Sequence, residues 1–534
     1  MRIGRRDPVA LVALATALST LLICLTCPFA VFASDGDLDL SFGNSGKVTT
    51  AFFPSTSGVI FTDIVWSLAL QPDGKVVAAG KVDQNPPQEG IHSVFGLARY
   101  NPDGSLDQSF GSGGKVVTDF FPDSDAAYSV SIQHDGKIVA VGAVAVMRYN
   151  PDGSLDASFG SGGKVATPLA HGSQLSAAAA VLQPDGRIVL GGNVMGALTY
   201  NFALARFNTD GSIDSGFGSG GSVVTEFPGQ VLALALEGDG RIVAAGTNTF
   251  NFTLARYNAD GSLDQTFGSS GLVNTDISGS GFDSANKIAI QPDGKIVAVG
   301  DGVFASGAAL VVARYNSDGS RDMAFGSSGI AMIPKGSGHA VAIQPDGKIL
   351  AGGSLEGPFS VLSFLLVRFN PDGSLDTGFG SSGVATTRLI DDGRCYAMEL
   401  EPEGRVVLAG TSYDLANSHA AFALARFQVT GIPPEGFGLV ADPSAITLSR
   451  GDKAVLGVNI LRQGGFAGAV TVTAPDASGM RIRISPSSGS TTGSRLEFTC
   501  KVKGKAVPGH YTLSFVGADD SGHTQSCTLA INVQ

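Results

Sequence analysis

Short apolar runs separated by glycine-containing turns fill most of this chain. Ile64–Leu70 is an apolar run, Gln71–Gly74 (QPDG) has the residues of a type I turn, and Lys75–Gly80 is a second apolar run. Proline at the second turn position and glycine at the fourth favour this turn, since proline fixes φ. No segment long enough for a sizeable helix repeats its apolar residues every 3.6 positions. The pattern therefore predicts antiparallel strands.

Three phrases recur in fixed order along the chain. Leu-Asp-x-Ser-Phe-Gly places its Phe at 42, 110, 159, 217, 267, 325 and 379. Gln-Pro-Asp-Gly-Lys places its Gly at 74, 136, 186, 240, 294, 347 and 404, and Leu-Ala-Arg-Tyr-Asn places its Arg at 99, 148, 206, 256, 314, 368 and 426. Each unit predicts four strands, which for the first are Gly46–Thr50, Ile64–Leu70, Lys75–Gly80 and Val94–Tyr100. Four strands per repeat of this length match one blade of a β-propeller.

The two ends of the repeat region complement each other. The last unit stops at Phe427–Gly431 without the Leu-Asp-x-Ser-Phe-Gly phrase, and the missing phrase stands at Asp35–Gly43. Joining them in one blade would close the ring and remove exposed strand edges. A solenoid is the rival architecture, but it would need capping units. The sequence predicts an all-β protein: a seven-bladed β-propeller over 35–431, closed by its N-terminal strand.

These phrases resemble the delta-60 repeat family of bacterial exported proteins, over roughly residues 35–431. The resemblance implies a propeller fold and no general activity. Three turns depart from the family phrase but keep its glycine, namely Gln133–Gly136 (QHDG), Glu237–Gly240 (EGDG) and Glu401–Gly404 (EPEG).

A repeated arginine is followed eight residues later by an aspartate in the first six units. Because the guanidinium fork suits a carboxylate, we expect a ring of partly buried salt bridges. An anion-binding ring of arginines is the alternative. The expected pairs are Arg99–Asp107, Arg148–Asp156, Arg206–Asp214, Arg256–Asp264, Arg314–Asp322, Arg368–Asp376 and, if the ring closes, Arg426–Asp39.

The N-terminus has the features of a secretory signal peptide over residues 1–33. Arg2, Arg5 and Arg6 precede an apolar stretch, Val9–Leu25, and small residues in Val31–Ala33 (VFA) suit cleavage before residue 34. A retained membrane anchor is the alternative. We expect an exported protein that is secreted, periplasmic or at the cell surface, with no membrane contact after cleavage.

Beyond a linker at 432–436, residues 437–534 predict an immunoglobulin-like β-sandwich. Gly464–Thr471 resembles the immunoglobulin-like modules of exported bacterial proteins, which implies a spacer or adhesion role. Cys500 and Cys527 could form a disulfide or remain two buried thiols. The expected strands are 454–460, 469–473, 481–484, 495–502, 510–516 and 526–533.

Chemistry-bearing motifs are scarce. The net charge of −12 argues against a nucleic-acid surface, and the seven histidines share no metal-ligand spacing. A calcium loop at Asn150, Asp152, Ser154 and Asp156 lacks the bidentate glutamate of an EF-hand, and these residues also suit an ordinary turn. We expect no cofactor, with calcium as the open alternative.

Two loops of each unit vary in length while the turns do not, and in an up-down blade both emerge on one face. Ligand sites lie where loops vary over a rigid scaffold. Aromatic or imidazole side chains there could bind a protein or carbohydrate ligand, or simply fill the propeller rim. The candidates are Phe52, Phe53, Phe61, His92, Tyr200, Phe250, Phe304 and Tyr413.

Two functional hypotheses remain. The first is a monomeric, non-catalytic binding or structural scaffold with a ligand face on the propeller. The second is a propeller enzyme, a lyase or sugar dehydrogenase, which would need histidine, glutamate and arginine to converge at one mouth of the central channel.

Overall fold

In the computed structural model the described chain consists of strands, with two short 3₁₀ turns, Pro358–Ser360 and Ser478–Met480. The signal-peptide prediction (1–33) and most of the linker prediction fall outside the described residues. No described helix is long and apolar enough to span a membrane. The structure describes residues 34–53, 61–84, 92–120, 125–167, 175–196, 199–248, 250–279, 281–414, 419–429, 436–442, 445–463, 468–519 and 524–534.

Each repeat forms one antiparallel sheet of four strands, hydrogen-bonded in chain order. The QPDG turn joins the first two strands: the N–H of Gly74 donates to the carbonyl of Gln71 at 3.0 Å, and Gly74 has φ +78°. Glycine adopts this φ readily because it has no Cβ. The strands of the first sheet are β2 (Ile64–Leu70), β3 (Val76–Gln84), β4 (His92–Tyr100) and β5 (Lys115–Thr118).

Five further sheets repeat this arrangement among the described residues. The second and third consist of β6 (Ser129–Ile132), β7 (Ile138–Val141), β8 (Ala145–Tyr149), β9 (Lys164–Ala166), and β10 (Ser176–Leu182), β11 (Ile188–Met195), β12 (Tyr200–Phe207), β13 (Ser222–Pro228). The fourth and fifth consist of β14 (Gln230–Leu236), β15 (Ile242–Asn248), β16 (Asn251–Tyr257), β17 (Leu272–Thr275), and β18 (Asp283–Ile290), β19 (Ile296–Phe304), β20 (Gly307–Tyr315), β21 (Ile330–Pro334). The sixth consists of β22 (Gly336–Ile343), β23 (Ile349–Glu356), β24 (Leu362–Phe369) and β25 (Val384–Thr387).

The seventh sheet combines the two ends of the repeat region. Strand β1 (Lys47–Thr50) pairs antiparallel with β28 (His419–Gln428), in a register from Lys47 opposite Ala425 to Thr50 opposite Phe422. The remaining strands of this sheet are β26 (Asp392–Glu401) and β27 (Arg405–Asp414).

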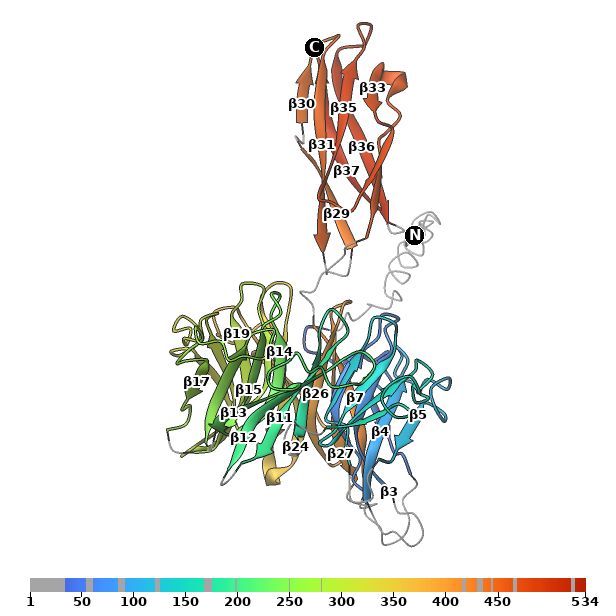
Figure 1. The fold of residues 1–534 in the computed structure, drawn as a ribbon. Helices are drawn as coiled ribbons and strands as arrows, with labels where there is room; N and C mark the ends of the chain where they lie inside the picture. Colours follow the sequence, from blue (N-terminus) through green and yellow to red (C-terminus); the bar gives the residue numbers. More distant parts are fainter. Residues whose placement is uncertain are drawn as a thin grey trace, which may run out of the picture.

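The first strands of the seven sheets contact one another in a cyclic order. Each contacts the first strands of two neighbouring sheets, in the order β2, β6, β10, β14, β18, β22 and β26, and β26 contacts β2. Apolar side chains fill the spaces between neighbouring sheets; Val65 and Val76, for example, share one cluster with Val407 and Phe422. Figure 1 shows these sheets gathered into a propeller-like body, with β14 and β26 toward its middle.

The C-terminal residues form two sheets around one apolar core, which includes Leu456 and Phe498 from one sheet and Val472 and Phe515 from the other. Strands β29, β30 and β34 were not predicted, and the sequence of β34, SGST, has no apolar residue that could mark a strand. The first sheet has the order β29 (Gly436–Asp442), β31 (Lys453–Gln463), β35 (Arg495–Val502), β33 (Ile482–Ser485). The second has the order β30 (Ala445–Leu448), β37 (Thr524–Val533), β36 (Gly509–Asp519), β32 (Val470–Thr473), β34 (Ser488–Thr491).

Candidate functional site

The repeated arginines lie within hydrogen-bond distance of the aspartates that follow them by eight residues. This spacing works because the N–H of the aspartate donates to the carbonyl of the arginine, which places both side chains on one side of the turn. The Nε–Oδ2 distances are 2.8 Å for Arg99–Asp107, 2.7 Å for Arg148–Asp156, 2.7 Å for Arg206–Asp214, 2.8 Å for Arg256–Asp264, 2.8 Å for Arg314–Asp322, 2.7 Å for Arg368–Asp376 and 2.9 Å for Arg426–Asp39.

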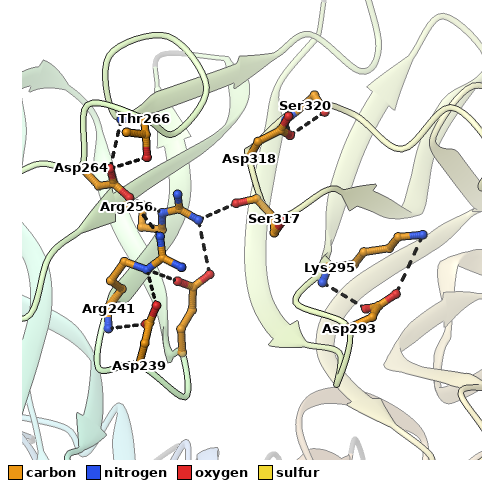
Figure 2. Close-up of polar contacts among 11 residues, drawn as sticks. Asp239, Arg241, Arg256, Asp264, Thr266, Asp293, Lys295, Ser317, Asp318 and Ser320 are labelled. Carbon is orange, nitrogen blue, oxygen red and sulfur yellow. Dashed lines mark hydrogen bonds and ion pairs between the residues drawn. The ribbon is translucent and has the colours of Figure 1, made fainter.

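Each arginine in this set also contacts a neighbouring repeat or its own phenylalanine. Figure 2 shows Arg256, which contacts Asp264 in its own repeat and donates to the carbonyl of Ser317 in the next repeat at 2.5 Å. Its guanidinium lies 4.5 Å from the centroid of Phe267, the phenylalanine of the Leu-Asp-x-Ser-Phe-Gly phrase. Arg426 donates in the same way to the carbonyl of Pro102, in the first repeat, at 2.5 Å. These side chains are engaged in packing between sheets, which leaves little of them for a ligand.

The aspartates of these pairs stay ionised at neutral pH. The hydroxyl of Thr266, together with its N–H and Arg256, outweighs burial and lowers the pKa of Asp264 to about 2. A carboxylate that accepts several hydrogen bonds beside a cation is stabilised in its charged form. The pairs therefore hold their charge across the physiological range.

The calcium loop considered from sequence has its oxygens engaged within the turn. Asp152 Oδ1 accepts from the N–H and hydroxyl of Ser154, at 2.9 and 2.7 Å, while Asn150 donates to the same hydroxyl at 3.0 Å. Asp156 contacts Arg148. Within the described ranges no three or more His, Cys, Asp or Glu side chains gather as metal ligands would.

The disulfide considered between Cys500 and Cys527 is not formed. Both are free thiols: Cys500 is fully buried on β35, and Cys527 on β37 packs against the same core. Burial raises the pKa of Cys500 to about 11, so it remains a protonated thiol that packs as a small apolar side chain. Sequence spacing could not decide this, because the two strands belong to different sheets.

Of the candidates for the ligand face, several are packed beneath it. Phe52, Phe61 and His92 are buried; Phe61 lies edge-on to His419, and His92 Nε2 is 3.3 Å from Asp119 Oδ2. Phe53, Phe304 and Tyr413 are half-buried. The sequence shows that these residues lie in variable loops. It does not show their burial, because that depends on how neighbouring repeats pack against the loops.

Tyr200 and Phe250 do reach the surface, with exposed fractions of 47% and 46%. Phe282, which sequence analysis missed, is 65% exposed, and its ring lies 4.6 Å from that of Phe250 in an edge-to-face contact. We call Tyr200, Phe250 and Phe282 the aromatic patch. A hollow of about 500 Å³ beside it is lined by Tyr200, Phe282, Gln230, Thr247, Ser284 and neighbouring loop residues.

A second cluster, not anticipated from sequence, lies on the first strands. In six of the described first strands a β-bulge shifts the register, as between Val65 and Ser67 around Trp66. A bulge adds an unpaired residue and redirects its side chain. The residue at this position, eight before each turn glycine, is Trp66, Tyr128, Ala178, Leu232, Asn286, His339 or Tyr396 in successive repeats.

Five of these residues form a continuous arc, which we call the axial cluster: Trp66, Tyr128, Asn286, His339 and Tyr396. Ring centroids are separated by 4.4 Å for Trp66–Tyr396, 6.0 Å for Trp66–Tyr128 and 5.3 Å for His339–Tyr396. Asn286 Nδ2 lies 3.3 Å from His339 Nδ1. The arc thus spans four consecutive steps around the circle of first strands.

The polar end of the axial cluster is held by Asp301. Its carboxylate accepts from Asn286 Nδ2 at 2.9 Å and from the N–H of Gly338 at 2.8 Å. Asn286 Nδ2 also donates to the carbonyl of Gly338 at 2.8 Å, so its two N–H groups are both engaged without His339 Nδ1. Burial lowers the pKa of His339, with Asp301 opposing and Arg394 adding to the effect, so the ring is neutral at pH 7.

One buried carboxyl near the variable loops makes stability depend on pH. Burial raises the pKa of Asp125 to about 7, against one hydrogen bond from the N–H of Ala126, and Asp119 adds to the rise. Unfolding returns this carboxyl toward its ordinary pKa of 3.8, so unfolding releases a proton between these values. The free energy of unfolding therefore falls as pH rises through this window.

We expect Asp125→Asn to be more stable than the wild type at pH 8, by about 1.4 kcal/mol per unit of pKa shift removed. The advantage should shrink toward pH 5, which denaturant titrations at both pH values would measure. Asp293→Asn, which changes an exposed turn carboxylate, should alter stability by no more than about 0.5 kcal/mol at either pH. Lower stability of Asp125→Asn at pH 8 would refute the burial argument.

These features define an all-β repeat protein with propeller-like sheets. Six segments match the family described as "Domain of unknown function (DUF5122) beta-propeller", at residues 71–110, 133–159, 183–217, 237–267, 291–325 and 344–379. The chain is a β-propeller repeat protein. The matched segments include the repeated turns and the arginine pairs of the first six units.

The solved structures that resemble this chain do so only weakly, and no curated protein matches the chain. A glucose dehydrogenase is 13% identical, with 71% of this chain and 99% of that chain aligned and a TM-score of 0.30. The S-layer protein rSbsC(31-844) is 10% identical, with 89% and 54% aligned and a TM-score of 0.16. Similarities at this level carry no argument about activity.

Proposed function

We propose that this protein is an exported, non-catalytic binding protein in which a closed seven-bladed propeller presents a ligand face. Closure is supported by the pairing of β1 with β28, by the Arg426–Asp39 contact and by the cyclic order of the first strands. Seven four-stranded sheets among the described residues support the blade count.

The remaining parts of the proposal concern export and the C-terminal domain. The delta-60 resemblance and the signal peptide over 1–33 favour export. The two C-terminal sheets around one core fit an immunoglobulin-like domain that spaces or holds the propeller.

The aromatic patch is the observation on which the ligand face depends. The face with the QPDG turns is nearly uniform from repeat to repeat, whereas the opposite face has variable loops and the exposed rings of Tyr200, Phe250 and Phe282 beside a hollow. Exposed aromatic side chains around a concavity are typical of binding surfaces. The ligand is a protein or a carbohydrate from the protein's surroundings.

We expect Tyr200→Ala/Phe250→Ala to weaken ligand binding at least tenfold, measured on panels of surface polysaccharides and envelope proteins. The matched control is Leu40→Ala/Met323→Ala, which removes two exposed apolar side chains from the Leu-Asp-x-Ser-Phe-Gly links on the uniform face. Its binding should equal that of the wild type. Loss of binding in the control with retention in the aromatic variant would overturn this assignment.

An enzyme with its site at the channel mouth is the second candidate, and Glu399 favours it. Burial raises the pKa of Glu399 on β26 to about 7, with Lys287 opposing, and a group titrating near neutrality suits proton transfer. A bound sugar can be incubated with the protein for a prolonged time and then recovered. If it is chemically unchanged, the protein binds the sugar and does not convert it.

A further inference from the structure

The bulge position of the first strands breaks the repetition of this chain. Structural positions recur, such as the turn glycine and the paired arginine, but the residue eight before the glycine differs strongly between repeats. It is aromatic in Tyr396, Trp66 and Tyr128, and polar in Asn286 and His339. Packing alone would accept the same residue in every repeat, as it does elsewhere. Unlike residues at equivalent positions of a repeated structure suit the binding of a single ligand that is itself asymmetric.

The aromatic end of the arc has an unused hydrogen-bond donor. Trp66 Nε1 is buried and has no partner among the described residues. Leaving such a donor unpaired is costly, so native chains seldom do so without a reason. Tyr128 and Tyr396 flank the indole. This end offers an aromatic wall together with a donor that a ligand oxygen could satisfy.

One cation lies beside the arc without an ion-pair partner among the described residues. Arg394 on β26 is exposed, acts on His339 and Tyr396, and has no carboxylate of the described residues within ion-pair distance. The carboxylate of Asp301, the nearest acid to the arc, already accepts two hydrogen bonds. In a chain with a net charge of −12, an arginine that no carboxylate pairs favours an anionic ligand at this place.

The polar end provides oriented groups for hydroxyl oxygens. His339 is a neutral imidazole, and the ring nitrogens of a neutral imidazole donate to or accept from hydroxyl groups. Burial raises the pKa of Tyr396 while Arg394 opposes, so the phenol hydroxyl remains a donor at neutral pH. Ser284, which donates to Asn286 Oδ1 at 2.9 Å, also lines the hollow beside the aromatic patch. The arc and that hollow therefore adjoin on one face.

We propose that the axial cluster binds a carboxylate-bearing sugar ring, of the uronic acid class. The apolar C–H face of the sugar would stack on Trp66, because the negative face of an aromatic ring attracts C–H groups. Its carboxylate would pair with the fork of Arg394, and its hydroxyls with His339 and Tyr396. This inference rests on the proposed function, since it names the ligand class for that face.

The test uses Trp66 itself, which is the one tryptophan of the chain. Glucuronate and galacturonate oligomers are titrated into the full protein while its tryptophan emission is recorded, with glucose, galactose and acetate as comparison probes. We expect a saturable change with the uronates and at least tenfold weaker apparent affinity for the neutral sugars and acetate.

Arg394→Met should lower uronate affinity at least tenfold, to the level of the neutral sugars. Arg388→Met, which changes another exposed arginine just before β26, should leave the affinity unchanged. Trp66→Phe, followed by calorimetry, should bind uronates more weakly but still detectably.

Equal affinity for neutral and acidic sugars, or an equal response to acetate alone, would overturn the proposal. So would an Arg394→Met protein that binds uronates as the wild type does. If no sugar changes the emission while a protein partner still depends on Tyr200 and Phe250, the uronate site is refuted and the proposed binding function stands.

Discussion

Arg256→Met is expected to lower the free energy of unfolding of the repeat region by about 3 to 5 kcal/mol. The arginine and Asp264 have exposed side-chain fractions of 3% and 9%. Methionine would leave this buried carboxylate with only the more exposed Arg241, 3.4 Å away, as a cation. The substitution would also remove the contact with the carbonyl of Ser317, which belongs to the next sheet. Guanidinium denaturation monitored by circular dichroism would measure the loss.

The matched control is Arg187→Met, which affects a 39% exposed arginine near Asp214. Exposed pairs contribute about 0 to 1 kcal/mol, so this variant should unfold close to the wild type. An unchanged midpoint for Arg256→Met would mean that these arginines do not hold the sheets together, and would revive the anion-binding alternative.

The same pair predicts a pH dependence of known sign. Because the pKa of Asp264 is lowered to about 2 from its ordinary 3.8, its contribution to stability is present above pH 3.8 and is lost as pH falls toward 2. The difference between wild type and Arg256→Met should therefore narrow below about pH 4.

Much of the fold could be predicted because each local signal recurs. Turn chemistry at Gln71–Gly74 and the eight-residue spacing of Arg99 and Asp107 are local properties, so one repeat is enough to interpret them. The sequence could not decide whether Cys500 and Cys527 form a disulfide. Their spacing along the chain does not determine the distance between two strands that belong to different sheets.

The axial cluster was missed for a different reason. Trp66, His339 and Tyr396 come from distant repeats and meet only when the first strands are arranged in a circle. A bulge also shifts the alternation of buried and exposed positions by one residue. A search for residues that alternate with a period of two therefore does not identify the residue at the bulge. Aligning the repeats on their turn glycines would have shown that the residue eight positions earlier changes between aromatic, polar and aliphatic types.

A chain that begins at residue 51 is expected to lose the cooperative unfolding of its last repeat, and a peptide of residues 34–50 should restore it. Without this segment β28 has an unpaired edge, and Arg426 loses the Asp39 carboxylate. Phe42 is fully buried, and removing such a phenylalanine costs about 3 to 5 kcal/mol. Single domains are stable by only about 5 to 15 kcal/mol, so the loss is large.

Thermal unfolding of the truncated chain, with and without peptide, would measure the rescue, and anisotropy of a labelled peptide would give its affinity. A control peptide with Asp39→Asn and Phe42→Ala keeps the length and the strand residues 47–50, but lacks the carboxylate and ring that contact Arg426. It should bind at least tenfold more weakly. The N-terminal strand does not close the ring if the truncated chain unfolds at the same temperature as the chain from residue 34 and binds neither peptide. A closed ring that loses one of its strands exposes a strand edge, so its stability must fall.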